Sequence, residues 1–133
     1  DVIVNIPVAK HHSGGQMSSA MKNWMGVVKD RGFWHKNNLN QCIADFGLFE
    51  KKPVLNVIDC YNVMVKNGPQ GVSAQDIVQM KSQILTADWV AGDTAAAKML
   101  GIDPERVEYI PMAHKMGLGN MKIESLSIKR IKM

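Results

Sequence analysis

The residues best suited to chemistry gather in one polar segment near the amino terminus, residues 10–23. The segment reads KHHSGGQMSSAMKN and combines two lysines, two adjacent histidines, two glycines and three serines. Ammonium groups and imidazoles attract anions, and backbone amides beside glycines can approach a bound group closely. This combination predicts a binding site for a phosphate or a carboxylate group.

Two other interpretations of the same segment remain open. Neighbouring histidines can bind a metal ion as neutral imidazoles, which gives a weaker hypothesis of a metal site built from His11 or His12 with Asp59. Adjacent side chains on an extended chain point apart, however, and nearby lysines repel a cation. The segment could also be an ordinary polar turn whose serines cap a helix. It is not the phosphate-binding pattern GxxxxGK[ST], because Lys22 follows Gly15 by seven residues.

Two carboxylates complete the candidate site. Asp59 follows an apolar run, so we expect it at the carboxyl end of a strand, where open α/β sheets bind ligands, or as the cap of the next turn. Asp93 lies in an alanine-rich stretch and could form an ion pair with Lys22, in which each group favours the charged form of the other; a capping or solvent-facing role is the alternative. No residue is assigned to a metal. The predicted catalytic residues are His12, Lys22 and Asp59, and the predicted ligand-binding residues are Lys10, His11, Gly14, Gly15, Ser18, Asn23 and Asp93.

The order of apolar and turn residues predicts the elements that hold this site. Strands are expected over residues 1–8, from 53 to near Asp59, over 79–87 and over 122–131. Helices are expected over 16–28, 39–49, 88–101 with Gly101 as C-cap, and 103–117 with Asp103 as N-cap and an interruption at Pro111. Residues 29–38 read as a loop and 66–71 as a turn. This alternation predicts an α/β fold with a mainly parallel or mixed sheet and helices packed on its faces.

The place of the polar segment follows from these elements. If the first strand ends near Val8 and the helix begins near Gln16, residues 10–15 form a loop at the carboxyl end of a strand. Ser18, Lys22 and Gly26 would then lie on one helical face, away from a buried stripe of methionines.

The composition is that of one ordinary domain. Its 133 residues, 46% hydrophobic and 21% charged, suit a single α/β domain over 1–133. No apolar run reaches the roughly 20 residues of a membrane helix, and the charge of +4 is scattered except in the tail IKRIKM, so neither a membrane span nor a nucleic-acid partner is predicted. Cys42 and Cys60 are too far apart for a local iron–sulfur or zinc motif, so no cofactor is predicted within this chain. The opening DVIV reads as a core strand without an initiator methionine, from which we expect the carboxyl-terminal part of a longer protein; no compartment is predicted.

One set of spacings resembles the hallmark of domain of unknown function family 362. It comprises Pro7, Lys10, His12, Ser18, Lys22, Asn23 and Gly26, followed in order by NGPQG from Asn67 to Gly71, LGIDPERV and KMGLGN. Cys60 departs from the family pattern, which often has glycine after the aspartate. The resemblance implies a prokaryotic protein of redox or small-molecule metabolism. Some relatives carry a ferredoxin-like domain, so an iron–sulfur cluster and a redox partner domain would belong to the rest of a full-length chain.

Two hypotheses of function follow. In the first, the domain belongs to an enzyme that acts on a small anionic metabolite: Lys10 and Lys22 hold the negative group, His12 is the general acid or base, and Asp59 or Asp93 orients a partner. In the second, it is a non-catalytic module that binds a ligand or docks a partner. The sequence identifies neither the substrate, nor the reaction, nor the oligomeric state.

Overall fold

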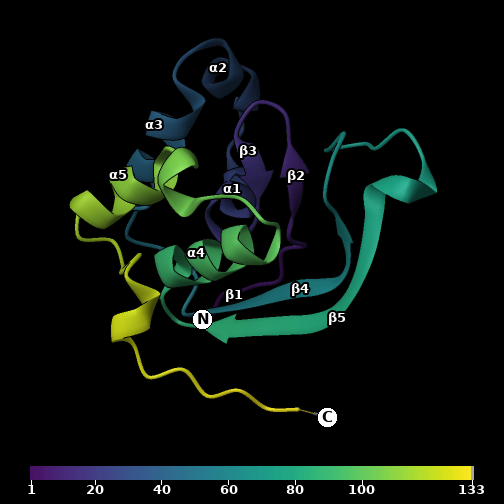
Figure 1. Ribbon diagram of the computed structural model, residues 1–133. Helices are drawn as coiled ribbons and strands as arrows, with labels where there is room; N and C mark the ends of the chain where they lie inside the picture. The colour runs from purple at the N-terminus through teal and green to yellow at the C-terminus, as the bar shows by residue number, and fades with distance from the viewer. Residues whose placement is uncertain (133) are drawn as a thin grey trace.

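A three-stranded mixed sheet with the order β1–β4–β5 lies at the base of the computed structural model, which describes residues 1–132 (Figure 1). Strand β1 (Val4–Asn5) runs parallel to β4 (Leu55–Met64), and β4 runs antiparallel to β5 (Ile77–Thr86). Both long strands are rich in β-branched and other apolar residues, which suit a pleated, half-buried surface. The predicted α/β fold with a mixed sheet is confirmed.

One face of the sheet is covered by helices. Buried residues alternate along β4, where Asn56, Ile58 and Cys60 have almost no exposed surface. On the neighbouring positions of the opposite face, Val4 is 45% exposed and Leu85 is 61% exposed. Figure 1 shows α4 lying along the inner face of β4 and β5. The alternation has the period of two that one covered face requires.

Residues 10–18 form a small β-hairpin, which corrects the prediction of a loop followed directly by a helix. Strand β2 (Lys10–His12) pairs antiparallel with β3 (Gln16–Ser18). Helix α1 (Ala20–Trp24) begins later than expected and continues into a 3₁₀ turn over Met25–Val27. Ser18 therefore lies on a strand, and the predicted helical face shared by Ser18, Lys22 and Gly26 does not form.

The helices that follow the hairpin are short and capped. Helix α2 (Arg31–Lys36) replaces the predicted loop, and the Asp30 side chain accepts a hydrogen bond from the Phe33 amide at its start. Helix α3 (Leu39–Phe46) confirms a prediction but ends before the lysine pair at 51–52. The predicted methionine stripe is correct in its burial but not in its helical form: Met17, Met21 and Met25 are all buried, whereas Met17 lies on β3 and not on a helix.

Helix α4 (Trp89–Met99) is the long helix that lies on the sheet. Asp88 caps its start by accepting a hydrogen bond from the Ala91 amide, and Gly101, with φ +71°, follows its end as predicted. A Cβ atom at Gly92 would lie 2.8 Å from Thr86 Cγ2, so a glycine is needed where the helix meets the sheet. The small side chains of α4 permit this close approach.

The carboxyl-terminal region differs from the sequence expectation in two ways. The predicted helix over 103–117 is divided into a 3₁₀ turn (Pro104–Arg106) capped by Asp103 and helix α5 (Tyr109–Lys115), whose first turn accommodates Pro111. The strand predicted over 122–131 is absent from the described residues, which hold a 3₁₀ turn over Ile123–Ser125 and an irregular tail instead. The apolar side chains of that tail have no strand to pair with and remain exposed.

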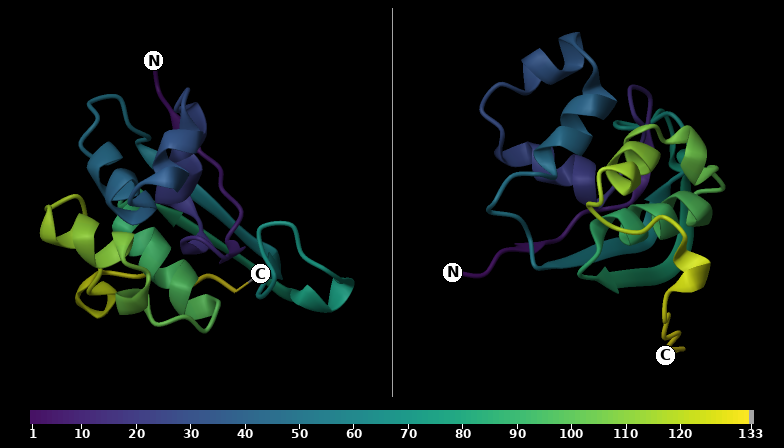
Figure 2. Two further views of the ribbon diagram at one scale, coloured as in Figure 1. Left: turned by 90° about the horizontal axis from the view of Figure 1, so that it is seen from above. Right: turned by 90° about the vertical axis from the view of Figure 1, so that its left-hand side faces the viewer.

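The helices gather into two groups that contact each other. Figure 2 shows α1, α2 and α3 together beside the pair α4 and α5, and the contacts of α1 with α4 and of α3 with α5 join the groups. The core between them and the sheet includes Met17, Ile43, Ile58, Val90, Tyr109 and Ile110. Within residues 1–132, no helix has the length and apolar character to cross a membrane.

Candidate functional site

The His12 ring is held by the turn of the hairpin. Its Nδ1 atom accepts hydrogen bonds from the backbone amides of Gly14, at 3.1 Å, and Gly15, at 3.3 Å. A neutral imidazole carries one hydrogen, and these contacts assign it to Nε2 because Nδ1 acts as an acceptor. The glycine amides therefore orient His12, and the free donor at this turn is the Nε2–H group of the ring.

Positive groups surround this imidazole. Lys10 and His12 lie two residues apart on β2 and share a face of the hairpin. Lys22 reaches back from α1, and its Cδ and Cε atoms would each lie 3.7 Å from a Cβ atom placed on Gly15. Desolvation and the charges of Lys22, His35, Lys10 and His11 together lower the pKa of His12 to about 4. Hence His12 is a neutral hydrogen-bond donor at neutral pH.

The lysines of this cluster have no acidic partner among the residues that the structure describes. Partial burial lowers the pKa of Lys22, and the nearby charge of Lys10 lowers it further. The ion pairs in the described part of the chain are Lys66 with Asp76 and Lys98 with Glu124, neither of which includes a lysine of the cluster. We call Lys10, His12 and Lys22, with the turn at Gly14 and Gly15, the cationic corner. No acidic side chain of residues 1–132 forms an ion pair with this corner.

His35 is a member of the site that the sequence interpretation placed in a loop. It lies on the last turn of α2, and its ring stacks on His12 with centroids 6.3 Å apart and planes inclined by 18°. The sequence signal for α2 was Asp30, an N-cap residue placed before the apolar pair Phe33 and Trp34. Recognising α2 would still not have located His35 beside His12, because the packing of α2 on the hairpin is a tertiary contact that the spacing of apolar residues does not predict.

His11 belongs to the other side of the hairpin. Its Nδ1 atom accepts a hydrogen bond from the Gly68 amide at 3.0 Å, and the Ser13 amide donates to the Gly68 carbonyl at 3.2 Å. Here a hollow of about 320 Å³ is bordered by His11, Ser13, Gln16, Gly101, Ile102, Asp103 and Arg106. The two adjacent histidines thus lie on opposite faces of the hairpin, because successive side chains of a strand point in opposite directions.

Asp93 holds the start of α1 and does not pair with Lys22, so the predicted ion pair is wrong. Its carboxylate accepts hydrogen bonds from the amides of Ala20 at 2.6 Å and Met21 at 3.1 Å, and the residue has no exposed surface. Burial raises its pKa to about 6 against the opposing effect of these hydrogen bonds. Asp93 reaches the cationic corner only through the backbone of α1, which makes it a positioning residue.

A network of asparagines fixes the same helix from the side of the sheet. Asn23, predicted as a ligand-binding residue, donates from Nδ2 to Asn5 Oδ1 at 2.7 Å. Asn5 in turn donates to the Ala20 carbonyl and to Asn56 Oδ1, both at 2.9 Å. Buried amides need such partners. Sequence reasoning missed Asn5 and Asn56, for which the available signal was an asparagine within each of two apolar strands.

Asp59 and Ser18 have different relations to the corner. Asp59 lies in the middle of β4 instead of at its end, and its Oδ1 atom accepts a hydrogen bond from the Tyr61 amide at 2.8 Å. Its charge is not among those that shift the pKa of His12 or Lys22. Ser18 pairs with Lys10 across the hairpin and so shares the face of that lysine.

Metal-binding geometry is not found among the described residues. No three side chains of the His, Cys, Asp and Glu types are grouped closely enough in residues 1–132 to hold an ion. In the hypothesis of a site from His11 or His12 with Asp59, three candidate ligand atoms are already occupied. Backbone amides donate hydrogen bonds to the Nδ1 atoms of both histidines and to Asp59 Oδ1. Cys60 is poorly suited to metal binding because a metal is bound by the thiolate form. The residue is fully buried, and burial raises the pKa of its thiol to about 11.

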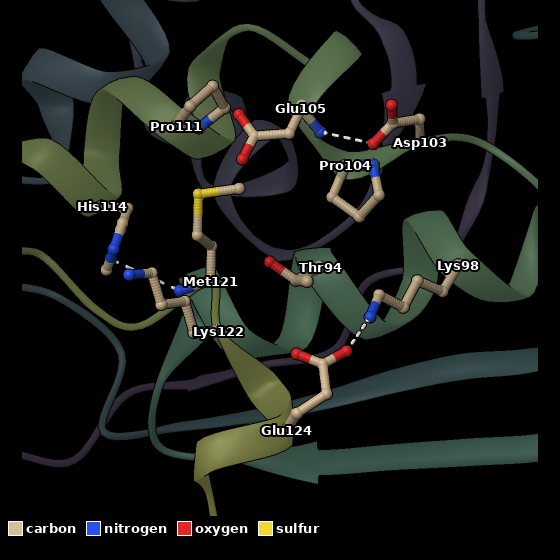
Figure 3. Close-up of a pocket in the computed structure, with 10 residues that line it drawn as sticks. All are labelled: Thr94, Lys98, Asp103, Pro104, Glu105, Pro111, His114, Met121, Lys122 and Glu124. Atoms are coloured by element: carbon tan, nitrogen blue, oxygen red, sulfur yellow. Dashed lines mark hydrogen bonds and ion pairs between the residues drawn. The ribbon is translucent and has the colours of Figure 1, made fainter.

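A separate groove of about 540 Å³ lies between α4, α5 and the segment that follows α5 (Figure 3). Its acidic and basic groups partly satisfy each other, as Figure 3 shows for Lys98 and Glu124. His114, which borders it, is engaged through Nδ1 with the Gly119 carbonyl at 3.0 Å. The mixture of charges gives this groove no preference for an anion over a cation.

Comparison with known proteins identifies one family. No curated protein and no solved structure matches the chain. The sequence pattern of the domain of unknown function DUF362 matches residues 1–98, which extend from β1 almost to the end of α4. The matched region includes the cationic corner as well as Asp59 and Asp93. Because the match covers 98 of the 133 residues, the chain belongs to the DUF362 family.

Proposed function

We propose that the cationic corner binds a small anionic metabolite through a carboxylate or phosphate group. The observation that carries the proposal is the gathering of Lys10 and Lys22 around a neutral His12, with no acidic partner within residues 1–132. Like charges held together raise the energy of the ligand-free site, and an anion relieves that repulsion. The free energy of anion binding is therefore expected to be more favourable here than at an isolated surface lysine.

The groups of the corner have separate roles in this proposal. The ammonium groups of Lys10 and Lys22 attract the negative charge, and the Nε2–H group of His12 donates a directed hydrogen bond. The amides of Gly14 and Gly15 do not contact the ligand, since both already donate to His12. For the same reason His12 contributes a hydrogen bond instead of acting as a general base through Nδ1.

Two modes of action are compatible with such a site. As part of an enzyme, the corner holds the anionic end of a substrate, and Lys22, with its lowered pKa, is the group best suited to transfer a proton. As a non-catalytic module, it holds a ligand for chemistry elsewhere. The position of Asp59, directed at its own backbone, favours this second candidate because it leaves the corner without a carboxylate base.

Titration with simple anions tests the proposal. We expect inorganic phosphate or propionate to bind, to raise the pKa of His12 observed by NMR, and to increase the melting temperature. Lys10→Met and Lys22→Met keep the apolar stems and should each weaken binding by about tenfold, the amount expected for losing one charge-assisted contact. Lys29→Met, an exposed lysine beyond α1, is the matched control. Equal affinities of all three variants and the wild type would exclude the proposed site.

The same experiment separates the two modes of action. If the corner belongs to an enzyme and the substrate is among the anions offered, the NMR signals of that small molecule change with time. If it is a binding module, the signals of every bound anion broaden or shift but retain their intensity over hours.

A further inference from the structure

Lys22 combines features that suit an amine nucleophile. Its side chain is partly buried, with the stem lying over Gly15, while its ammonium group has Lys10 as a like-charged neighbour. Neither ion pair found within residues 1–132 involves it. Desolvation and a neighbouring cation both favour the neutral amine, which is the form that attacks a carbonyl carbon.

The helix that carries Lys22 is fixed from two directions. Asp93 holds the amides of Ala20 and Met21, and Asn5 holds the Ala20 carbonyl. A nucleophile requires a defined position relative to its electrophile, and these buried contacts supply it through the backbone. A lysine on an exposed, unanchored segment lacks that constraint.

We propose that Lys22 forms a Schiff base with a small carbonyl compound that carries a negative group, of which a 2-oxo acid is the simplest case. The inference rests on the proposed anion-binding function, because Lys10 is assigned to the negative group. It adds the chemical class of the ligand and a covalent step.

The covalent step is balanced without any oxidant, reductant or metal. The lone pair of the neutral Lys22 Nζ forms a bond to the carbonyl carbon, and the carbonyl oxygen takes up a proton while nitrogen loses one through solvent. The resulting hydroxyl group accepts the hydrogen bond of His12 Nε2–H, takes a proton from solvent and leaves as water. The nitrogen loses its remaining hydrogen, or retains it as the protonated imine.

The substrate class follows from the two lysines and the imidazole. In a 2-oxo acid the carboxylate is bonded directly to the carbonyl carbon, so one ammonium can hold the acid while a neighbouring amine attacks. Desolvated lysines beside a second cationic group are a known arrangement for activated amines. An anion without a carbonyl group would bind in the same corner and form no bond.

Reductive trapping tests this inference on the full chain. Pyruvate and sodium cyanoborohydride are added at several pH values, and the reduced adducts are located and quantified by peptide mass spectrometry. We expect several-fold more adduct at Lys22 than at the exposed Lys29, and an onset of labelling at lower pH for Lys22. Propionate should compete with the adduct at Lys22 and leave the adduct at Lys29 unchanged.

Two variants and a parallel titration make the outcomes distinct. Lys22→Arg retains the positive charge and should abolish the selective adduct, whereas Lys10→Met should reduce its amount by weakening capture of the carboxylate. Equal labelling of Lys22 and Lys29 overturns the Schiff base inference. If phosphate and propionate still shift the His12 signals in that case, the anion-binding function stands; if they do not, both fail. A circular dichroism spectrum confirms that each variant is folded.

Discussion

The imidazole of His35 lies stacked on that of His12, with the ring centroids 6.3 Å apart. This contact brings α2, the helix that sequence patterns did not predict, against the hairpin that holds the cationic corner. His35 also contributes to the low pKa of His12. The cationic corner is thus bordered by α2 as well as by the hairpin, two elements that are separated in the chain by α1.

Removal of the stacked ring should raise the pKa of His12. His35→Ala removes the electrostatic effect of His35 on His12 and exposes the face of the His12 ring to water, and both changes favour the protonated form of His12. An NMR titration of the histidine side chains measures the shift upward from about 4. Lys36→Ala, which removes a charge from the same helix, is the control and should leave this pKa unchanged.

Titration of His12 should make stability depend on pH. The pKa of His12 is 6.5 in the unfolded chain and about 4 in the folded protein, so its contribution is complete above pH 6.5 and is lost as the pH falls toward 4. His12→Asn retains an acceptor for the two glycine amides but does not titrate, so the free energy of unfolding should vary less with pH over this interval. Urea denaturation at a series of pH values measures it. A variant curve parallel to the wild type would contradict the assignment.

Asp93 should produce a pH dependence of the opposite sign. Its pKa rises from 3.8 in the unfolded chain to about 6 in the folded protein, so its contribution is complete below pH 3.8 and is lost as the pH rises through 6. Asp93→Asn should remove this slope. Asp93→Ala leaves the amides of Ala20 and Met21 buried without an acceptor and should lower the free energy of unfolding by about 2–4 kcal/mol. Denaturation of both variants separates the charge from the hydrogen bonds.

Two glycines of the site region should differ sharply in their tolerance of a methyl group. A Cβ atom at Gly68 would overlap the His11 carbonyl oxygen, so Gly68→Ala must displace the backbone and should cost about 2 kcal/mol or more. At Gly15 the nearest atoms would be 3.6 Å away or more, so Gly15→Ala should change the free energy of unfolding by less than about 1 kcal/mol. Similar melting temperatures for the two variants would show that the loop around Gly68 does not pack as described.

The sequence was most informative where local patterns decide the structure. The apolar character of Met17, Met21 and Met25 predicted buried positions, although Met17 lies on β3 instead of the expected helix, and Gly101 predicted the end of α4. The prediction failed at residues 10–18, which form a hairpin. The turn of this hairpin places Gln16 in the left-handed conformation, with φ +61°, and a glutamine gives no sequence signal for that conformation. The prediction also failed at 122–131, where strand-like alternation found no partner strand.

The candidate site was predictable in its residues more than in its contacts. Lys10, His12 and Lys22 were recognised because their types and spacing are unusual, and the structure places them in one cluster. Asp59 and Asp93 were assigned from their residue type and their place in the predicted strand and helix, but their roles depend on register and burial, which are properties of the whole fold. His35 could be found only once the position of α2 was known.

The hydrogen bond from the Ala20 amide to the Asp93 carboxylate joins residues that are 73 positions apart in the chain. A peptide or a graft restricted to residues 7–26 would carry every lysine and histidine of the corner but lack the carboxylate that fixes their scaffold. The corner therefore cannot be transferred to another protein as a short segment. A search for the same corner in other proteins has to include the distant aspartate.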